Sequence, residues 1–127
     1  MPKTVLNGDR LSRVVCERNR KNYCRVSQNE VKPKAFKPNS DGDTSIFLTS
    51  GLTEDTIWHL GENHLCGENN VYGRADITAD KIFELEKIRI DYNDDPEYHA
   101  NLVWPDDKEE IQDMTQLLAA EADCIAR

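Results

Sequence analysis

The chain has 127 residues, of which 38% are hydrophobic and 31% charged, and its formal net charge is −8. This length fits a single domain over residues 1–127 and leaves little room for a second. No apolar run approaches the ~20 residues of a membrane-spanning helix, so we expect no membrane contact, and the acidic balance makes nucleic acid an unlikely partner.

Charge is divided unevenly along the chain. Residues 1–38 carry ten lysines and arginines against three acids, whereas residues 39–127 carry six against twenty-one. Residues 1–21 are polar and weakly periodic, and we expect a weakly ordered basic segment there. Because they contain no apolar leader stretch, we expect a cytoplasmic location.

The cysteine count is even and would allow two disulfides. The expected cytoplasmic location favours reduced thiols instead, and no C-x-x-C pair is present. The four cysteines are Cys16, Cys24, Cys66 and Cys124.

The first half of the chain predicts two strands and a helix. Residues 22–26 alternate in polarity and predict a first strand. Residues 32–43 contain two prolines and an Asp-Gly pair, which predict a loop. The sequence TSIFLT at 44–49 is rich in β-forming residues and predicts a second strand. Thr53 is placed to cap a helix that ends near Gly61.

The second half predicts three strands, a short helix and a long one. Strands are predicted over 71–77, 87–91 and 98–103, with a short helix over 79–85. A helix of about 20 residues follows Pro105, with its apolar residues spaced three or four apart. They are Ile111, Met114, Leu118, Ala122 and Ile125. The predicted fold class is α+β, a small mixed or antiparallel sheet with this amphipathic C-terminal helix packed on it.

Two histidines and a cysteine lie close together in sequence at His59, His64 and Cys66. Imidazole and thiolate are zinc ligands, but this spacing matches no standard zinc motif. We therefore predict no metal site, and leave open the alternative that these three side chains bind a metal.

Polar residues on the predicted strands suggest a small-ligand site. Arg25 lies within a strand, where a guanidinium needs an anionic partner. In the hypothesis, Arg25 binds a phosphate or carboxylate that Ser27 and Ser45 orient, and His99 and Glu97 are the catalytic groups that move a proton. In the alternative, Arg25 pairs with one of the many acids in the C-terminal part of the chain, and His99 caps a turn by hydrogen bonding.

Short pieces of the chain resemble a group of small uncharacterised bacterial proteins. The resemblance covers about residues 23–125 and implies the order of the elements, with no activity attached to it. The pieces are CRVS at 24–27, AFKP at 35–38, TSIF at 44–47, RADIT at 74–78 and HANLVWP at 99–105.

A more distant similarity is to ADP-ribosyltransferase-type toxins. Those proteins place an Arg or His on a first strand, a hydroxyl or Tyr on a second, and an acid on a later one. The similarity implies that Arg25, Ser45 and Glu97 are the matching positions. The chain departs from that pattern because Glu97 belongs to Asp95-Pro96-Glu97, which is neither E-x-E nor Q-x-E.

Two functions from different classes remain open. The first is binding of a small anionic ligand, for example a nucleotide, at Arg25, Ser45 and His99, in an enzyme or a sensor of unknown cofactor. The second is a non-catalytic acidic module, such as an immunity protein, antitoxin or adaptor, whose acidic stretches at 91–97 and 106–110 meet a basic protein partner. The sequence does not decide whether the chain is an enzyme.

Overall fold

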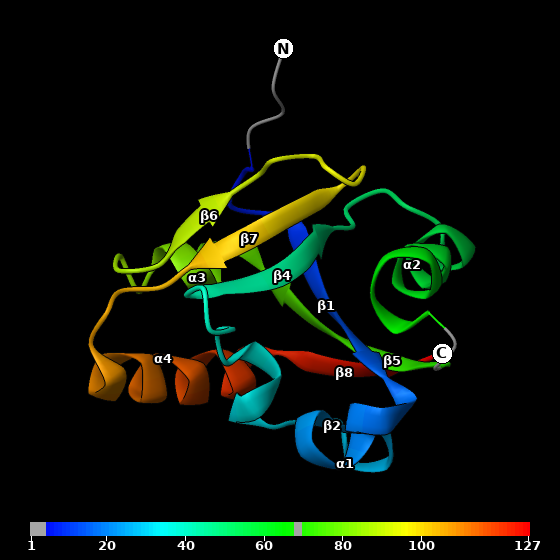
Figure 1. Ribbon diagram of the computed structural model, residues 1–127, viewed down its shortest axis with the longest axis horizontal. Helices are drawn as coiled ribbons and strands as arrows, with labels where there is room; N and C mark the ends of the chain where they lie inside the picture. Colours follow the sequence, from blue (N-terminus) through cyan, green and yellow to red (C-terminus); the bar gives the residue numbers. More distant parts are fainter. Residues whose placement is uncertain (1–4, 68–69) are drawn as a thin grey trace.

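The computed structural model describes residues 5–67 and 70–127 and is built around a six-stranded antiparallel sheet (Figure 1). The strand order across the sheet is β6-β7-β4-β1-β5-β8. The predicted α+β class is therefore confirmed. The strands are β1 (Arg10–Cys16), β4 (Asp43–Leu48), β5 (Val71–Thr78), β6 (Arg89–Asp91), β7 (His99–Val103) and β8 (Asp123–Ala126).

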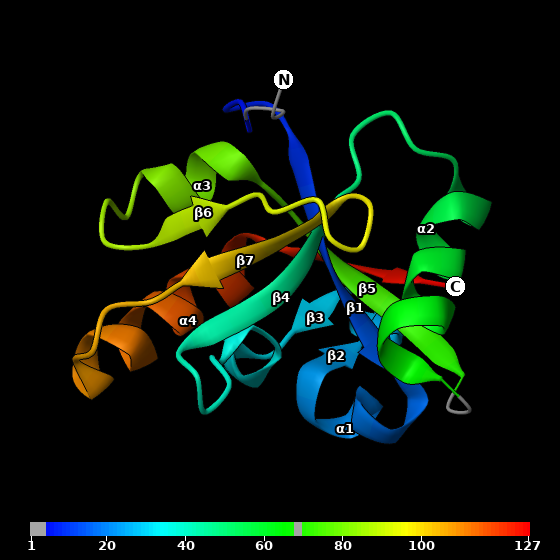
Figure 2. The same cartoon turned by 45° about the horizontal axis from the view of Figure 1, so that its top comes forward.

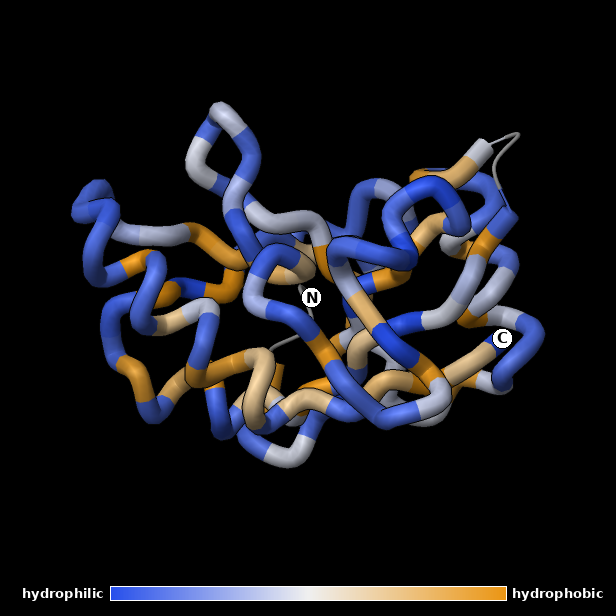
Figure 3. The backbone as a smooth tube through the Cα atoms, turned by 90° about the horizontal axis from the view of Figure 1, so that it is seen from below, coloured by the Kyte–Doolittle hydropathy of each residue, from blue (hydrophilic) through white to orange (hydrophobic). Residues whose placement is uncertain are grey.

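Helices cover both faces of this sheet to different extents. The helices α3 (Ala79–Phe83) and α4 (Lys108–Glu121) and the 3-10 turn η3 (Pro33–Phe36) share one hydrophobic core with the sheet. The helix α2 (Glu54–Gly61) and the π-helical turn η4 (Glu62–Cys66) contribute to a smaller cluster on the other face. In Figure 3 the peripheral loops are mostly hydrophilic, as expected for segments in contact with water.

Successive side chains of each strand point to opposite faces of the sheet, so one face is mainly apolar and the other carries most of the polar residues. The apolar face carries the core side chains and is closed by α3, α4 and η3. Its members include Leu11, Val15, Ile46, Leu48, Ala75, Ile77, Ala100 and Leu102. The polar face carries Ser12, Ser45, Arg74, Asp76, His99 and Asn101, as the registers place them. The helix α2 lies over the part of this face near β1 and β5, where Trp58 and Glu54 contact Arg74.

Close packing fixes α2 against β1. A Cβ added at Gly61 would lie 2.6 Å from Cγ1 of Val14, so a larger residue would push the helix away from the strand. Thr53 caps the helix as predicted, because its hydroxyl accepts a hydrogen bond from the Thr56 amide.

The prediction of reduced thiols is wrong for this structure. One disulfide joins Cys16 to Cys66 and ties the end of β1 to the turn η4. The other joins Cys24 to Cys124 and ties a small two-stranded sheet to the edge strand β8. The pairing depends on which strands are neighbours, and the linear sequence does not contain that information.

Two regions at the start of the chain differ from prediction. Within the segment expected to be weakly ordered, residues 10–16 form β1, which lies between β4 and β5 in the sheet. The strand predicted over 22–26 shrinks to β2 (Cys24–Arg25), which pairs with β3 (Glu30–Val31) in a separate sheet visible in Figure 2. Around it lie the short helices η1 (Glu17–Asn19), α1 (Arg20–Tyr23) and η2 (Val26–Gln28).

The C-terminal helix is shorter than predicted at both ends. The Asp107 carboxylate caps it by accepting hydrogen bonds from the amides of Glu109 and Glu110 at 2.9 and 3.1 Å. The helix ends at Glu121, and residues 123–126 turn back as β8 along β5, so Ile125 belongs to a strand. Within the described residues, no helix combines the length and apolar character needed to cross a membrane.

Candidate functional site

Four polar-face residues of β4 and β7 lie next to one another. In the antiparallel register, Ser45 stands opposite Asn101 and Phe47 opposite His99. Residues two apart on a strand share a face, so Ser45, Phe47, His99 and Asn101 form one neighbourhood. This part of the polar face is only half-buried at Ser45, His99 and Asn101, which leaves it open to solvent.

A chain of two hydrogen bonds passes through the imidazole of His99. The Nε2 atom of His99 lies 2.7 Å from Oγ of Ser45, and Nδ1 lies 2.9 Å from Oδ1 of Asn93. The amide of Asp95 also donates to Asn93 Oδ1 at 3.2 Å, which identifies that atom as an acceptor. His99 therefore carries its proton on Nδ1, and its unprotonated Nε2 accepts a hydrogen bond from the Ser45 hydroxyl.

The loop between β6 and β7 holds Asn93 in place beside the imidazole. Asp94 accepts hydrogen bonds from the Tyr92 hydroxyl at 2.9 Å and the Tyr98 amide at 2.8 Å. The Asp94 amide in turn donates to the carbonyl of His99 at 2.9 Å. These bonds close the loop on itself, so the side chain of Asn93 is positioned before any ligand arrives.

The surroundings of His99 favour its neutral form. Burial is the main reason that the pKa of His99 lies below its ordinary value, and the positive charge of nearby His64 lowers it further, against the opposing influence of Asp95 and Asp91. The ring of Phe47 packs edge-on against the imidazole, with centroids 5.7 Å apart. A neutral imidazole at neutral pH can accept a proton from the serine hydroxyl.

The strand that carries Ser45 is also held from the apolar face. Arg13 donates from Nη1 to the carbonyl of Ser45 and from Nε to the carbonyl of Ala35, both at 3.0 Å. Burial lowers the pKa of Arg13, while its contact with Tyr23 acts in the opposite direction. This half-buried guanidinium therefore fixes the backbone of β4 at Ser45.

The five residues predicted from sequence do not form one site. Ser45 and His99 are in direct contact, whereas Arg25 is exposed in the small sheet and pairs with Glu30 at 3.8 Å. Ser27 is exposed in η2, and Figure 1 shows β2 and β7 in separate parts of the molecule. The assignment of Arg25 and Ser27 to a site with His99 is thus corrected.

Glu97 also lies apart from the hydrogen-bonded pair. It is exposed in the β6–β7 loop and hydrogen-bonds to Tyr98, whose pKa it raises. The third member of the array is Asn93, which sequence reasoning assigned only to a turn. An asparagine six residues before a strand-borne histidine, across a tight proline turn, was the one available signal.

The suggested metal ligands are separated by the fold. Cys66 is bonded to Cys16, which removes its thiolate, and His59 is exposed on α2. Across residues 5–67 and 70–127, no three His, Cys, Asp or Glu side chains are grouped closely enough to hold a metal ion.

A second polar cluster on the same face lies beneath α2. Arg74 is 2% exposed and donates to both oxygens of Asp76, at 2.9 and 3.0 Å, and to both oxygens of Glu54, at 2.6 and 3.1 Å. The Ser12 hydroxyl lies 2.6 Å from Asp76 and 2.8 Å from the Thr49 hydroxyl. We call Ser12, Thr49, Glu54, Arg74 and Asp76 the covered cluster.

The covered cluster has the character of a structural network. The hydrogen bond from Arg74 is the main reason that the pKa of Glu54 is lowered. Burial acts to lower the pKa of Arg74, but its bonds to Glu54 and Asp76 outweigh it and raise that pKa. The guanidinium also lies 4.8 Å from the ring of Trp58 in α2. One guanidinium is thus held between two carboxylates, of which Asp76 is nearly buried and Glu54 is largely exposed.

Comparison with known proteins finds no matching family model, no matching curated protein and no matching solved structure.

Proposed function

We propose that the protein is a small hydrolase or acyl-transfer enzyme in which Ser45 is the nucleophile and His99 the general base. The observation that carries the proposal is the oriented array Ser45–His99–Asn93, with a lowered imidazole pKa and an opening to solvent. A hydroxyl bonded to a neutral imidazole, whose other nitrogen is fixed by a third group, is the arrangement that activates serine nucleophiles.

In the proposed reaction, Oγ of Ser45 attacks the carbonyl carbon of an ester as Nε2 of His99 takes the hydroxyl proton. His99 then returns that proton to the leaving alcohol, and the acyl group stays on Ser45. Water attacks the acyl-enzyme with the same imidazole as base, which releases the acid and restores the serine. Asn93 keeps the Nδ1 proton in place and orients the ring throughout.

The developing oxyanion needs a hydrogen-bond donor, and the candidate is the carboxamide of Asn101. It stands opposite Ser45 on the same face of the sheet. The Ser45 backbone lies within a strand paired on β7, so side chains are the more available donors. In this role Asn101 would supply electrostatic stabilisation of the transition state.

Charge around the site favours a neutral or cationic substrate. Asp91 lies opposite Asn101 in the register of β6 and β7, and both Asp91 and Asp95 are close enough to influence the His99 pKa. Arg25, the cation expected to hold an anionic ligand here, lies in the other sheet. We therefore propose an uncharged or positively charged ester rather than the anionic ligand predicted from sequence.

The test is reaction with a fluorophosphonate probe and hydrolysis of p-nitrophenyl acetate, measured for wild type, Ser45→Ala and His99→Gln. We expect labelling of Ser45 and a loss of at least about 100-fold in kcat/KM for either variant. The matched control is Ser40→Ala, an exposed serine outside the array, which should leave both readouts unchanged. The rate should rise with pH to a plateau, with its midpoint below the ordinary histidine pKa of 6.5. Absence of labelling, or equal labelling of Ser45→Ala, would refute the proposal.

The acidic binding module is the second candidate, because the β6–β7 loop exposes its three carboxylates to solvent. The acids that begin α4 are exposed as well, but the five-residue strand β7 separates the two groups by about 17 Å. A basic partner would therefore meet two patches rather than one surface. The test is salt-sensitive capture of a partner from the native cell, lost in Asp95→Asn with Glu97→Gln and kept in Glu84→Gln with Glu86→Gln.

The cytoplasmic location expected from sequence stays a prediction. We infer that an oxidising compartment suits the chain better, because two disulfides persist where thiols are not kept reduced. Acid-quenched alkylation of the protein from its native cell distinguishes the two: four alkylated cysteines indicate a reducing compartment, and none an oxidising one.

A further inference from the structure

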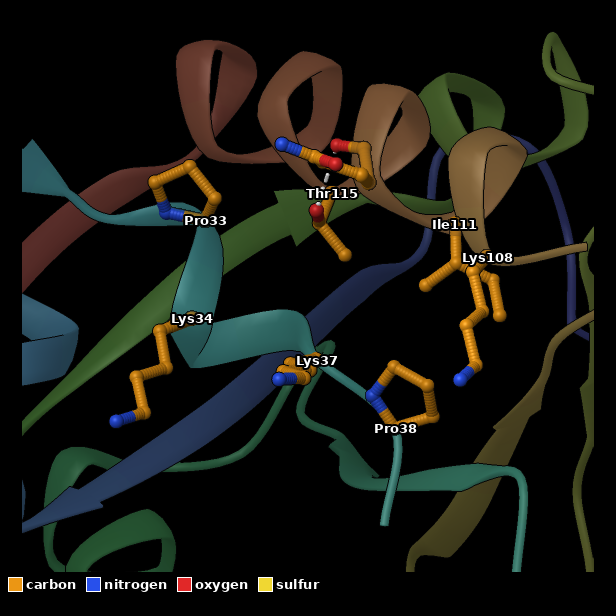
Figure 4. Close-up of a pocket in the computed structure, with 8 residues that line it drawn as sticks. Pro33, Lys34, Lys37, Pro38, Lys108, Ile111 and Thr115 are labelled. Carbon is orange, nitrogen blue, oxygen red and sulfur yellow. Dashed lines mark hydrogen bonds between the residues drawn. The ribbon is translucent and has the colours of Figure 1, made fainter. Parts of the chain in front are cut away.

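A groove lies on the side of the molecule opposite the Ser45–His99 pair. It runs between η3 and α4, both of which pack on the apolar face of the sheet, and has a volume of about 680 Å³ (Figure 4). That volume is within the range of small-molecule sites in proteins. The groove is therefore independent of the proposed catalytic array.

Three lysines and no acid line this groove. Lys34 and Lys37 come from the η3 side and Lys108 from the first turn of α4. All three are exposed, and none has a carboxylate within ion-pair distance in the described part of the chain. In a protein of net charge −8, this groove is therefore lined by three cations that have no ion-pair partner among the described residues.

The other residues that line the groove are three apolar ones and the polar residues Gln112 and Thr115. Ile111 is half-buried on α4, and Pro33 and Pro38 stand at either end of the η3 segment. Figure 4 shows Lys108 and Ile111 extending from the same helix toward Pro38. A ligand with an anionic part for the ammonium groups and a flat apolar part for this surface would match both features.

We propose that this groove binds a polyphosphate group attached to an apolar ring, as in a nucleoside triphosphate. Three ammonium groups match a ligand with three or more negative charges, because Lys binds phosphate as a point charge. The prolines and Ile111 provide a rigid apolar surface for the ring. The site would make the protein a nucleotide-binding one on the face that the catalytic array does not use.

Calorimetric titration in magnesium-free buffer tests the proposal with ATP, tripolyphosphate and adenosine as separate probes. We expect ATP to bind, tripolyphosphate to bind more weakly and adenosine to give no heat. Removing two charges in Lys34→Gln with Lys37→Gln should weaken ATP binding about tenfold. The matched control, Arg18→Gln with Lys21→Gln, removes two exposed cations outside the groove and should stay near wild type.

Location is tested by methyl NMR of Ile111 during the same titrations. A shift of this methyl by ATP, absent in the Lys34→Gln and Lys37→Gln variant, supports the groove. Tripolyphosphate binding as tight as ATP would restrict the site to inorganic polyphosphate and overturn the nucleotide assignment. Binding of a hexaglutamate peptide without ATP binding, equal weakening by the control, or no binding at all would overturn the proposal. None of these outcomes depends on Ser45 reactivity.

Discussion

Two polar clusters occupy the same face of one sheet, and they differ in what lies over them. The covered cluster is closed by α2, and Arg74 within it is matched by two carboxylates. The Ser45–His99–Asn93 array lies beyond that helix and is half-exposed, with an imidazole whose pKa is lowered. Each contains a serine that is hydrogen-bonded to an ionisable side chain, Ser12 to Asp76 and Ser45 to His99. The difference indicates that solvent exposure, rather than residue type, distinguishes the ion-paired covered cluster from the neutral imidazole beside Ser45.

The largest effect is expected from removing the guanidinium of the covered cluster. Arg74→Met leaves the carboxylate of Asp76, which is 11% exposed, without its cation. Loss of one partner of a buried pair typically costs about 3–5 kcal/mol of unfolding free energy. Urea denaturation should show this loss, with Arg25→Ala as a control near zero because its ion pair with Glu30 is exposed. A loss below that of the control would mean that the cluster does not stabilise the fold.

The second largest loss of stability is expected from removing the disulfide that holds η4, and with it α2, against β1. Replacing Cys16 and Cys66 together by alanine frees the turn η4 from β1. Loss of such a bridge typically costs about 2–4 kcal/mol, and hydrogen exchange should rise first in α2. If α2 stays as protected as in the wild type, the disulfide is not what holds the helix over the covered cluster.

A pair of serine variants compares the clusters directly. Ser12→Ala removes a fully buried hydroxyl from between Thr49 and Asp76, which we expect to cost about 1–3 kcal/mol. Ser45→Ala removes a half-buried hydroxyl and should cost about 0.5–1.5 kcal/mol, while abolishing any reaction with the fluorophosphonate. Thermal melts and labelling of the two variants should give opposite rankings. Equal costs would indicate that Ser45 is structural like Ser12.

The smallest effect concerns pH. Because burial lowers the pKa of folded His99 below its ordinary 6.5, the unfolded chain binds more protons between these two values. The stability contribution of neutral His99 is therefore complete above about pH 6.5 and is lost as the pH falls toward the folded pKa. The drop in Tm from about pH 7.5 to about pH 5.5 should be smaller in His99→Gln than in wild type. An unchanged drop would show that His99 is not held neutral.

The sequence predicted the fold class and most strands because their signals are local. β-forming residues mark β4, and alternation marks β6. β1 was missed because Arg13 occupies a core-facing position, where its guanidinium is satisfied by the carbonyls of Ala35 and Ser45. Those carbonyls are distant in sequence, so the pattern of β1 resembles a polar segment until the fold is known.

The sequence predicted only part of the candidate site, because contacts between residues distant in sequence leave no local pattern. Ser45 and His99 were placed on separate strands and suspected of sharing a site, and β4 does pair with β7. The sequence places Arg25 in the same sheet because polar and apolar residues alternate around it. In the structure the extended strand ends at Arg25, and the 3-10 turn η2 begins at Val26. Asn93 acquires its role only through the loop that brings it back to His99, which no local pattern describes.

The two disulfides cross one another along the chain, since Cys24 lies between Cys16 and Cys66, and Cys124 lies beyond both. Any single backbone cut between residues 16 and 124 therefore leaves fragments that remain covalently joined. A protease that nicks an exposed loop would change the mass of the intact protein only by one water. The fragments would separate on a gel only after a reductant is added, so apparent resistance to digestion without reductant would be misleading.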